Sequence, residues 1–247
     1  MKMSFISDTH IKTAEDYRAV LGKFFDNPQV AESEHIFLLG DIFDLMVGDH
    51  KEYRDQFGDF FDRVNTLLAS GKNIYYVEGN HDFHLENLFA EFFNTKRFFY
   101  YKKGFTKKLG QRSYYFTHGD DLEIGNRSYK VYRAFVGSPP LRLIANHAMP
   151  YSILEKLGSR ASKKSKMRNK KRKNAEGSIS HIRDKFRSGA EKFLKKNIDI
   201  DFIVAGHNHV QDNYLINDKS TYLNIGYPVK TGEFLVIENN EIHFVKV

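Results

Sequence analysis

Apolar runs that end in polar motifs rich in Asp, Asn or His set the pattern of this chain. The clearest run, His35 to Leu39, is short and continuous and is closed by Gly40, which is typical of a strand buried on both faces. Four further runs repeat this pattern, so we predict five buried strands. The runs, each with the motif that follows it, are Phe5-Ile6 with Asp8-Thr9-His10, His35 to Leu39 with Gly40-Asp41-Ile42-Phe43-Asp44, Ile74 to Val77 with Gly79-Asn80-His81-Asp82, Tyr114 to Phe116 with His118-Gly119-Asp120, and Phe202 to Ala205 with Gly206-His207-Asn208-His209.

Apolar side chains recur at helical spacing in the two intervals that separate the first three runs. The intervals Ala14 to Phe25 and Tyr53 to Ala69 both carry apolar residues three and four positions apart, which predicts two covering helices. The second interval stops near Ser70-Gly71, and glycine commonly follows the end of a helix. The order strand, helix, strand, helix, strand predicts parallel pairing through right-handed crossovers.

The later part of the chain predicts a second sheet. Leu85 to Phe93 is expected to form a short helix, and Arg97 to Tyr101 a strand rich in aromatic residues. Glycine-containing turns before His118, such as Leu109-Gly110-Gln111, favour a hairpin there. The tail from Thr221 to Val247 is expected to add further strands. Together with the hairpin, these are more strands than one sheet of this pattern contains.

One interval, residues 125–182, does not continue this alternation of strands and helices. It holds apolar helical stretches at Tyr129 to Val136 and Leu141 to Leu157, and the pair Pro139-Pro140 lies between them. A basic run follows these stretches. We therefore predict a single domain, residues 1–247, in which residues 125–182 form an inserted, basic helical lid.

The positive charge of the chain is concentrated in that insertion. The net charge is +7, yet Lys156 to Lys173 alone holds ten Lys or Arg and no acidic residue. Because the remainder is slightly acidic, this basicity does not by itself predict a nucleic-acid-binding protein. A solvated basic face and a surface for phosphate or anionic lipid are both open interpretations of the run.

Absent residue types and segments narrow the ligand chemistry and the compartment. The chain has no Cys, so a metal ion would be held by oxygen and nitrogen ligands. No apolar run approaches the roughly 18 residues that a membrane-spanning helix needs. The apolar stretch before Asp8 is too short for a signal peptide. We therefore expect a cytoplasmic protein.

The motifs at the strand ends have the residue types of a metal site. The carboxyl ends of neighbouring parallel strands open onto one crevice, so residues far apart in the sequence can meet there. Imidazole, carboxylate and amide oxygen suit divalent metals with mixed ligation, and Asp41 is our candidate for a bridge between two ions. The members of the pairs Asp8 with His10 and His207 with His209 would point the same way from an extended segment. Any one histidine alone is more simply a core or surface residue, but seven candidates share this context: Asp8, His10, Asp41, Asn80, His118, His207 and His209.

The order of the five motifs between residues 8 and 209 resembles the signature of the calcineurin-like metallophosphoesterases. The resemblance implies an α/β fold, a four-layer α/β/β/α sandwich of two mixed sheets, here with the helical lid inserted. It also implies two metal sites that share one carboxylate. One ion would take Asp8, His10, Asp41 and His209, and the other would take Asp41, Asn80, His118 and His207.

Such a site needs no protein nucleophile. Two divalent ions about 4 Å apart can hold a bridging water, lower its pKa and place the resulting hydroxide for attack on phosphorus. In related enzymes the residue at His81 lies near the leaving oxygen, where imidazole can give up a proton. Asp82 is our candidate to orient a ligand imidazole or to fix His81. Asp44 either shares that role or caps the following turn.

A closer resemblance joins the chain to the bacterial UDP-2,3-diacylglucosamine hydrolases of lipid A synthesis. This resemblance rests on the stretch Gly79-Asn80-His81-Asp82-Phe83, on the motif His118-Gly119-Asp120 followed by Tyr129 and Arg133-Ala134, and on the basic insertion. Best-known members carry Arg where this chain has His81, and His is the general choice of the superfamily. The resemblance implies hydrolysis of the pyrophosphate to UMP and 2,3-diacylglucosamine 1-phosphate with Mn²⁺, for which Fe or Zn is the alternative.

The same resemblance implies partners for the lid. A nucleotide-linked acylated glucosamine would bind there, and lipid at the cytoplasmic face of the inner membrane would attract the basic run. Apolar lid residues would contact acyl chains or the headgroup boundary. No particular protein partner is indicated. The candidate substrate contacts are Asn126, Arg133, Lys163, Lys164 and Lys166.

Two other functions compete with this one. A phosphodiesterase or nuclease of the same superfamily could use the basic run to follow a phosphate backbone. Aromatic and basic residues are not interleaved there, as base stacking would require, so nucleic acid is not the expected partner. A non-catalytic scaffold of the same fold is the third possibility, but loss of metal-ligand residues is typical of such scaffolds and all seven are present here.

Overall fold

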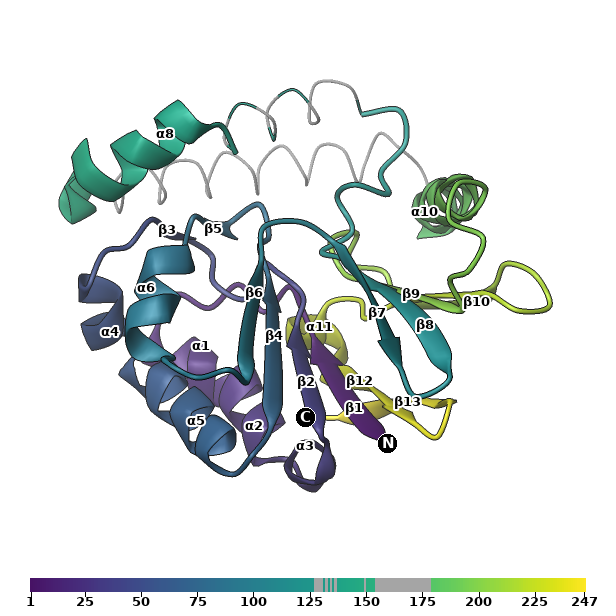
Figure 1. Ribbon diagram of the computed structural model, residues 1–247, viewed down its shortest axis with the longest axis horizontal. Coiled ribbons are helices and arrows are strands. Elements are labelled where there is room, and N and C mark those ends of the chain that lie inside the picture. The colour runs from purple at the N-terminus through teal and green to yellow at the C-terminus, as the bar shows by residue number, and fades with distance from the viewer. Residues whose placement is uncertain (127–130, 132, 134, 136, 149, 154–178) are drawn as a thin grey trace.

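The computed structural model describes residues 1–126, 131, 133, 135, 137–148, 150–153 and 179–247 (Figure 1). Most of the predicted insertion lies outside these ranges. This applies to the basic run at 156–173 and, with it, to the candidate substrate contacts Lys163, Lys164 and Lys166. Among the described residues, no helix combines the length and the apolar character that crossing a bilayer requires.

The first sheet contains six strands in the order β13-β12-β1-β2-β4-β6. The neighbours β1-β2, β2-β4 and β4-β6 are parallel, as the strand-helix alternation predicts. At the other side of β1, β12 pairs with it antiparallel, so the sheet is mixed. These strands are β1 (Lys2–Ile6), β2 (His35–Leu38), β4 (Asn73–Val77), β6 (Phe98–Tyr101), β12 (Glu233–Glu238) and β13 (Glu241–Lys246).

The second sheet contains five strands in the order β10-β11-β9-β8-β7. The hairpin predicted before His118 is present as β7 and β8, and β8 continues into parallel pairing with β9. A separate two-stranded parallel sheet lies near the ends of the first sheet. The strands of these two sheets are β7 (Phe105–Leu109), β8 (Arg112–Phe116), β9 (Phe202–Ala205), β10 (Asp212–Leu215) and β11 (Thr221–Asn224), with β3 (Met46–Val47) and β5 (Asp82–Phe83) in the small one.

Both predicted covering helices form, with local departures from a regular α-helix. The first runs from Ala14 to Asp26 and has a π-helical centre. The second is interrupted at Phe57, whose backbone leaves the helical region while its ring packs 4.6 Å from that of Phe43. The helical segments are α1 (Ala14–Asp16), η1 (Tyr17–Gly22), α2 (Lys23–Asp26), α3 (Pro28–Glu32), α4 (Glu52–Gln56), α5 (Gly58–Ala69), α6 (Glu86–Phe92), α8 (Pro139–Leu143), η2 (Ile144–Ala148), α10 (Ile179–Leu194) and α11 (Pro228–Thr231).

The two sheets face each other across an aromatic core. Phe5, Phe37 and Tyr75 come from adjacent strands of the first sheet and stack in a row, with ring centroids 4.6 and 4.5 Å apart. Phe116 from the second sheet packs against Phe37 at 4.2 Å. Because aromatic pairs add to the free energy of burial, this row fixes the distance between the sheets. The two sheets are the inner layers of the predicted sandwich.

Helices cover the outer face of each sheet, which completes the four layers (Figure 1). On the first sheet, Phe60, Phe61 and Val64 of α5 are fully buried in one apolar cluster. On the second sheet, α10 contributes Phe186 and Ala190 to another cluster. Helix α10 was not among the predicted elements. It begins inside the predicted insertion and continues to Leu194, and the bounds 125–182 for a lid stay a prediction.

The described part of the insertion is attached beside β3 and β5. His50 Nε2 lies 3.0 Å from the carbonyl oxygen of Ala145, and Ala145 packs with Val47 in a small apolar cluster. Arg142 forms an ion pair with Glu86 of α6. These contacts place α8 and η2 beside β3 and β5, at one end of the first sheet (Figure 1).

Candidate metal centre

Backbone hydrogen bonds join the loops that carry the candidate ligands. The N–H of Asp8 donates to the carbonyl of Gly40 at 3.0 Å, and the N–H of His10 donates to the carbonyl of Asp41 at 3.0 Å. Within the second sheet, the N–H of Gly206 donates to the carbonyl of His118 at 2.8 Å, and between the two sheets the N–H of His207 donates to Asp8 Oδ2 at 2.9 Å. The polar motifs therefore meet at one end of the sandwich, as expected from the shared direction of the strands.

The backbone conformation that brings these side chains together is not the extended one that we expected. Five of the candidate ligands have a left-handed backbone with φ between 46° and 71°, so the alternation of an extended segment does not direct their side chains. Such residues cost of order 1–3 kcal/mol each and persist only where the surrounding structure holds them. Asp and His tolerate this region better than most residues. The five are Asp8, His10, Asp41, His207 and His209.

Two motif glycines leave room for the carboxylates. A Cβ atom at Gly79 would lie 2.2 Å from Oδ1 of Asp41, and one at Gly206 would lie 2.3 Å from Oδ2 of Asp8. Real side chains do not approach this closely, so any larger residue would displace the carboxylate. This explains why glycine precedes Asn80 and His207 in the two motifs.

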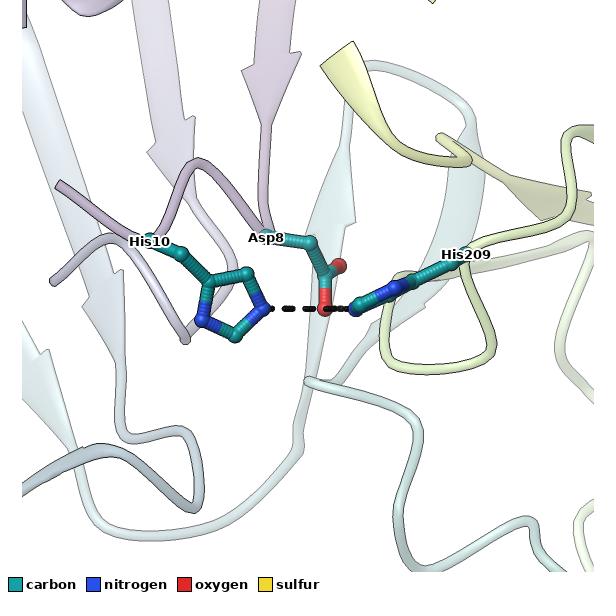
Figure 2. Close-up of side chains that lie close together, drawn as sticks. All are labelled: Asp8, His10 and His209. Carbon is teal, nitrogen blue, oxygen red and sulfur yellow. Dashed lines mark hydrogen bonds and ion pairs between the residues drawn. The ribbon is translucent and has the colours of Figure 1, made fainter. Parts of the chain in front are cut away.

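Asp8, His10 and His209 form the first cluster (Figure 2). His209 Nε2 lies 3.2 Å from Asp8 Oδ1 and 3.3 Å from His10 Nε2. The approach to Asp8 lacks hydrogen-bond geometry, and Oδ1 is buried without a hydrogen-bond donor among the described residues. A cation site requires such an oxygen, one that is buried beside imidazole nitrogens and accepts no hydrogen bond.

Asp41, Asn80, His118 and His207 form the second cluster. His118 Nε2 lies 3.1 Å from Asn80 Oδ1, 3.1 Å from His207 Nδ1 and 3.6 Å from Asp41 Oδ2. Asp41 Oδ2 is also 3.9 Å from His10 Nε2 of the first cluster. The other oxygen, Oδ1, accepts the N–H groups of Asn80 and His81 at 2.8 and 2.9 Å. Asp41 thus presents one oxygen to both clusters while the other holds the neighbouring loop.

The seven side chains fit divalent metal ions. Each lies within 4 Å of another member, so all seven belong to one continuous group. Their donor atoms are carboxylate oxygens, an amide oxygen and imidazole nitrogens, which is the mixed set that first-row divalent metals accept. The buried Asp8 Oδ1, which has no hydrogen-bond donor among the described residues, supports the same interpretation. That these residues ligate metal is a proposal, developed below.

The pKa shifts of the candidate histidines differ between the first and the second cluster. Burial lowers the pKa of His10 to about 4, so this imidazole is neutral at pH 7 and has a lone pair to offer. For His118 burial acts in the same direction, but the charges of Asp41, Asp8 and Asp120 outweigh it and raise the pKa to about 9. The pKa of Asp41 lies below its ordinary value because the surrounding histidines, His118 first, overcome the effect of its burial. The metal-free site is therefore an ionised carboxylate among histidines.

Asp82 has a different place from the one expected. Its Oδ1 accepts the N–H groups of Asp41 and Gly79 at 2.9 and 2.8 Å. Its Oδ2 accepts the N–H of Ile42 at 2.6 Å and the hydroxyl of Tyr76 at 2.6 Å. The carboxylate thus fastens two loops by their backbones. Burial, followed by the charge of Asp41, raises the pKa of Asp82 to about 7.

The carbonyl of Asp44 holds His81. His81 Nδ1 lies 2.8 Å from that oxygen, which can only accept, so Nδ1 carries the proton in this bond. The side chain of Asp44 lies 2.8 Å from Lys12 Nζ and 3.9 Å from His10 Nδ1. Asp44 therefore holds His81 through its backbone, and its carboxylate lies beside His10 without a hydrogen bond to it.

Glu123 is a site residue that the sequence analysis missed. Its Oε2 lies 3.7 Å from His207 Nε2 and accepts the amide of Asn126 at 3.0 Å, and its Oε1 is 2.6 Å from Lys185 Nζ. Glu123 lies five residues after His118 and belongs to no metal-ligand spacing, so nothing in the sequence singled it out. Of the predicted substrate contacts that are described, Asn126 thus pairs with Glu123.

The other described candidate, Arg133, donates from Nε to Asp120 Oδ2 at 2.8 Å. Asp120 belongs to the His118-Gly119-Asp120 motif, so Arg133 is held near the second cluster through a neighbour of His118. This position beside the site is compatible with a substrate contact, which stays a prediction.

Comparison with known proteins places this site in a family. The sequence model of the calcineurin-like phosphoesterases matches residues 1–211. A UDP-2,3-diacylglucosamine hydrolase from Histophilus somni strain 2336 is 24% identical over 244 residues, which cover 99% of each chain. A protein of the same name from Pasteurella multocida strain Pm70 is 26% identical over 247 residues, covering 99% of this chain and 98% of the relative.

Solved structures agree on the fold. A dimetal phosphatase from Danio rerio aligns with a TM-score of 0.50 and 12% identity, over 100% of this chain and 97% of the other. At this identity the likeness concerns the fold alone. The match of the family model, in contrast, extends over most of the chain and includes all five motifs. The chain therefore belongs to the calcineurin-like phosphoesterase family and is a metal-dependent phosphoester hydrolase.

Proposed function

We propose that this protein hydrolyses the pyrophosphate bond of UDP-2,3-diacylglucosamine, releasing UMP and 2,3-diacylglucosamine 1-phosphate. The observation that carries the proposal is the match to hydrolases of that name along nearly the full length of both chains. A nucleotide-linked acylated glucosamine has a charged diphosphate and long apolar chains. The protein offers a matching pair of features, a candidate metal centre and an apolar insertion beside it.

The candidate ligands divide between two positions for divalent ions. Asp8, His10 and His209 would hold the first ion, and Asn80, His118 and His207 would hold the second, with Asp41 Oδ2 between them. When bound, the ions supply positive charge beside the phosphoryl oxygens and lower the pKa of a water molecule. We propose Mn²⁺ for both positions, with Fe or Zn as the alternative. The protein's own residues then orient the diphosphate and handle the proton of the leaving group.

His81 is the proposed proton donor to the leaving oxygen. Because Nδ1 is engaged with the carbonyl of Asp44, only Nε2 is available for proton transfer. The ring lies edge-on to His10 with centroids 4.9 Å apart, so it borders the first cluster without being one of the seven candidate ligands. Its position suits contact with substrate.

Replacing His81 should separate catalysis from metal binding. We expect His81→Ala to lower kcat by about 10²-fold or more, because positioned proton transfer contributes roughly 10²–10⁴-fold. Metal content, measured by plasma mass spectrometry, should equal that of the wild type. His243→Ala is the matched control, because His243 lies on β13, outside the site. A wild-type kcat in His81→Ala would refute the proposed role.

The described part of the insertion presents apolar side chains to solvent. Phe135 and Leu143 are each 62% exposed, and Val131 is 70% exposed. Two contacts hold the described residues of this segment to the sandwich, because Arg133 donates to Asp120 of the His118 motif and Ala145 packs with Val47. We propose that the exposed apolar side chains receive the acyl chains and contact lipid at the cytoplasmic face of the inner membrane. Each single exposed apolar residue is ordinary, but their grouping on one segment supports a shared role.

The direct test is to incubate the purified protein and Mn²⁺ with UDP-2,3-diacylglucosamine and to measure UMP. Release of UMP with the acylated glucosamine 1-phosphate is the expected result. Cleavage of single-stranded DNA or of a generic aryl phosphodiester without UMP release would favour another phosphodiesterase of the family. Failure to cleave any of the three substrates would contradict the assignment of a hydrolase.

The insertion should matter for the lipid substrate alone. We expect Phe135→Ser to raise KM for UDP-2,3-diacylglucosamine by about tenfold or more, because an apolar side chain of this size contributes roughly 1.5–3 kcal/mol when it is buried and about 1.4 kcal/mol is a factor of ten. KM for an aryl phosphodiester should not change. Ile198→Ser is the matched control, since Ile198 is 82% exposed and lies outside the insertion. Equal effects on both substrates would count against lipid contact at this position.

A further inference from the structure

A tyrosine outside every sequence motif stacks on the candidate ligand His209. The rings of Tyr227 and His209 are parallel within 6° and their centroids are 4.6 Å apart. The Tyr227 ring also meets that of His10 edge-on at 6.2 Å. One aromatic side chain thus borders both imidazoles of the first cluster. It follows β11, far in sequence from both histidines.

The end of β11 is fastened to the loop that carries His209. The amide nitrogen of Asn224 donates to the carbonyl of Gly206 at 2.7 Å. Its amide oxygen accepts the N–H of Gly226 at 3.0 Å. Asn224 is fully buried, so both bonds lie in a region from which water is excluded. Hydrogen bonds of one buried side chain therefore join the loop after β9 to the loop after β11.

The backbone on both sides of Tyr227 is also held. Gly226 has φ +86°, and a Cβ there would lie 3.0 Å from Gln211, so only glycine allows this close approach. The carbonyl of Tyr227 accepts the N–H groups of Lys230 and Thr231 at 2.9 and 3.0 Å as α11 begins. The ring of Tyr227 is thus presented to His209 by a rigid support.

His209 needs such support more than the other candidate histidines. Its side chain is 31% exposed, compared with 15% for His10 and for His207 and 1% for His118. Its backbone is left-handed, with φ 61°. Among the described residues, the ring contacts Asp8 and His10 through its Nε2 atom and Tyr227 through its face. The parallel face of Tyr227 is the aromatic contact that limits rotation of the ring.

We propose that Tyr227 is a positioning residue for the metal centre. It holds the His209 ring so that Nε2 points to Asp8 and His10, and it thereby raises the affinity of the first cluster for a divalent cation. An imidazole that binds a cation becomes more positive, and an electron-rich aromatic face favours that state. The proposal rests on the proposed metal centre and assigns it a supporting residue on another strand.

The ring, and not the hydroxyl, carries this role. Among the described residues, the Tyr227 hydroxyl takes part in no hydrogen bond. Tyr227→Phe retains the stacked ring and removes only the hydroxyl. Tyr227→Leu removes the aromatic face but keeps an apolar side chain. The two variants therefore distinguish stacking from any polar function of the residue.

Calorimetric titration of the metal-free protein with Mn²⁺ tests the proposal. We expect Tyr227→Leu to weaken one of two binding steps by about tenfold, the lower end of the 10–100-fold range for residues that support metal ligands. Tyr227→Phe should bind both ions as the wild type does. Tyr214→Leu is the matched control, because this tyrosine lies on β10 of the same sheet and its ring contacts Arg187 instead of a candidate ligand.

The outcomes separate this proposal from the function it rests on. Wild-type affinity at both steps in Tyr227→Leu would overturn the positioning role and leave the metal centre standing. An equal loss in Tyr214→Leu would overturn it too, because a general loss of stability would then explain both results. A wild-type protein that binds no Mn²⁺ would remove the metal centre itself. The thermal unfolding midpoint of each metal-free variant provides the check on folding.

Discussion

Asp41→Asn is expected to abolish turnover and to reduce metal binding at both positions at once. The bridge proposed for Asp41 rests on Oδ2, which lies 3.9 Å from His10 Nε2 and 3.6 Å from His118 Nε2. An amide nitrogen in that place would offer protons where lone pairs are needed, and the carboxylate charge would be lost. We expect kcat to fall by roughly 10³-fold or more, the scale of removing one central electrostatic contact.

Asparagine is the most informative replacement because it keeps the hydrogen bonds that Asp41 accepts at Oδ1. Its amide oxygen can still accept the N–H groups of Asn80 and His81, which Oδ1 receives in the wild type. The loop should therefore keep its place, and a loss of metal cannot be attributed to a displaced loop. Asp218→Asn in the exposed turn between β10 and β11 controls for the change of charge.

Plasma mass spectrometry of the protein after dialysis against Mn²⁺, together with UMP release, measures both effects. The wild type and Asp218→Asn should each retain two ions per chain. A variant Asp41→Asn that retained both ions and wild-type turnover would exclude Asp41 as the bridge. Loss of a single ion would assign Asp41 to one position only.

The centre of the first sheet could be predicted because β1, β2 and β4 are almost entirely buried. The continuous apolar runs at His35 to Leu39 and Ile74 to Val77 have no polar face, and the helices between them follow the ordinary spacing. Helix α10 was not predicted although its apolar residues Ile182, Phe186 and Leu194 keep helical spacing. The helix begins inside the interval 125–182, which we predicted as the lid, so these residues were not separated from the insertion. Gly189 on its buried face approaches the carbonyl of Leu122, where a Cβ would lie 2.0 Å away, and such a contact with another segment cannot be predicted from the sequence of the helix.

The candidate site could be predicted as a group but not as a geometry. Each of the seven residues follows an apolar run, which is a local signal. The direction of each side chain depends on left-handed backbone, for which the local sequence gives no rule that distinguishes Asp8 from any other Asp. Glu123 and Tyr227 contact the candidate ligands His207 and His209 only through the fold, and no motif contains them. The partners of Asp82 could not be predicted, because most are backbone N–H groups, which a sequence motif does not reveal. A role of Asp82 in orienting an imidazole stays a prediction.

Asp82→Ala is therefore expected to act first on stability. Asp82 is fully buried, and its carboxylate accepts hydrogen bonds from Asp41, Gly79 and Ile42 and from the hydroxyl of Tyr76. Alanine would leave these donors buried without an acceptor, at roughly 1–3 kcal/mol each before the structure relaxes. We expect the free energy of unfolding to fall by about 3–5 kcal/mol. In a chain of this size each kcal/mol lowers Tm by about 2–4 °C, so a shift near 10 °C is expected.

Tyr76→Phe is the graded control, since it removes one of these hydrogen bonds and leaves the carboxylate in place. It should cost about 1 kcal/mol, the typical contribution of a single hydrogen bond. Thermal and denaturant unfolding of the metal-free proteins would measure both variants without any contribution from bound ions. If Asp82→Ala were no less stable than Tyr76→Phe, the carboxylate would not be the fastening between the Asp41 and Asn80 loops. The ligand geometry would then have to depend on the sheets alone, and Asp82 would again be a candidate for a direct role in the reaction.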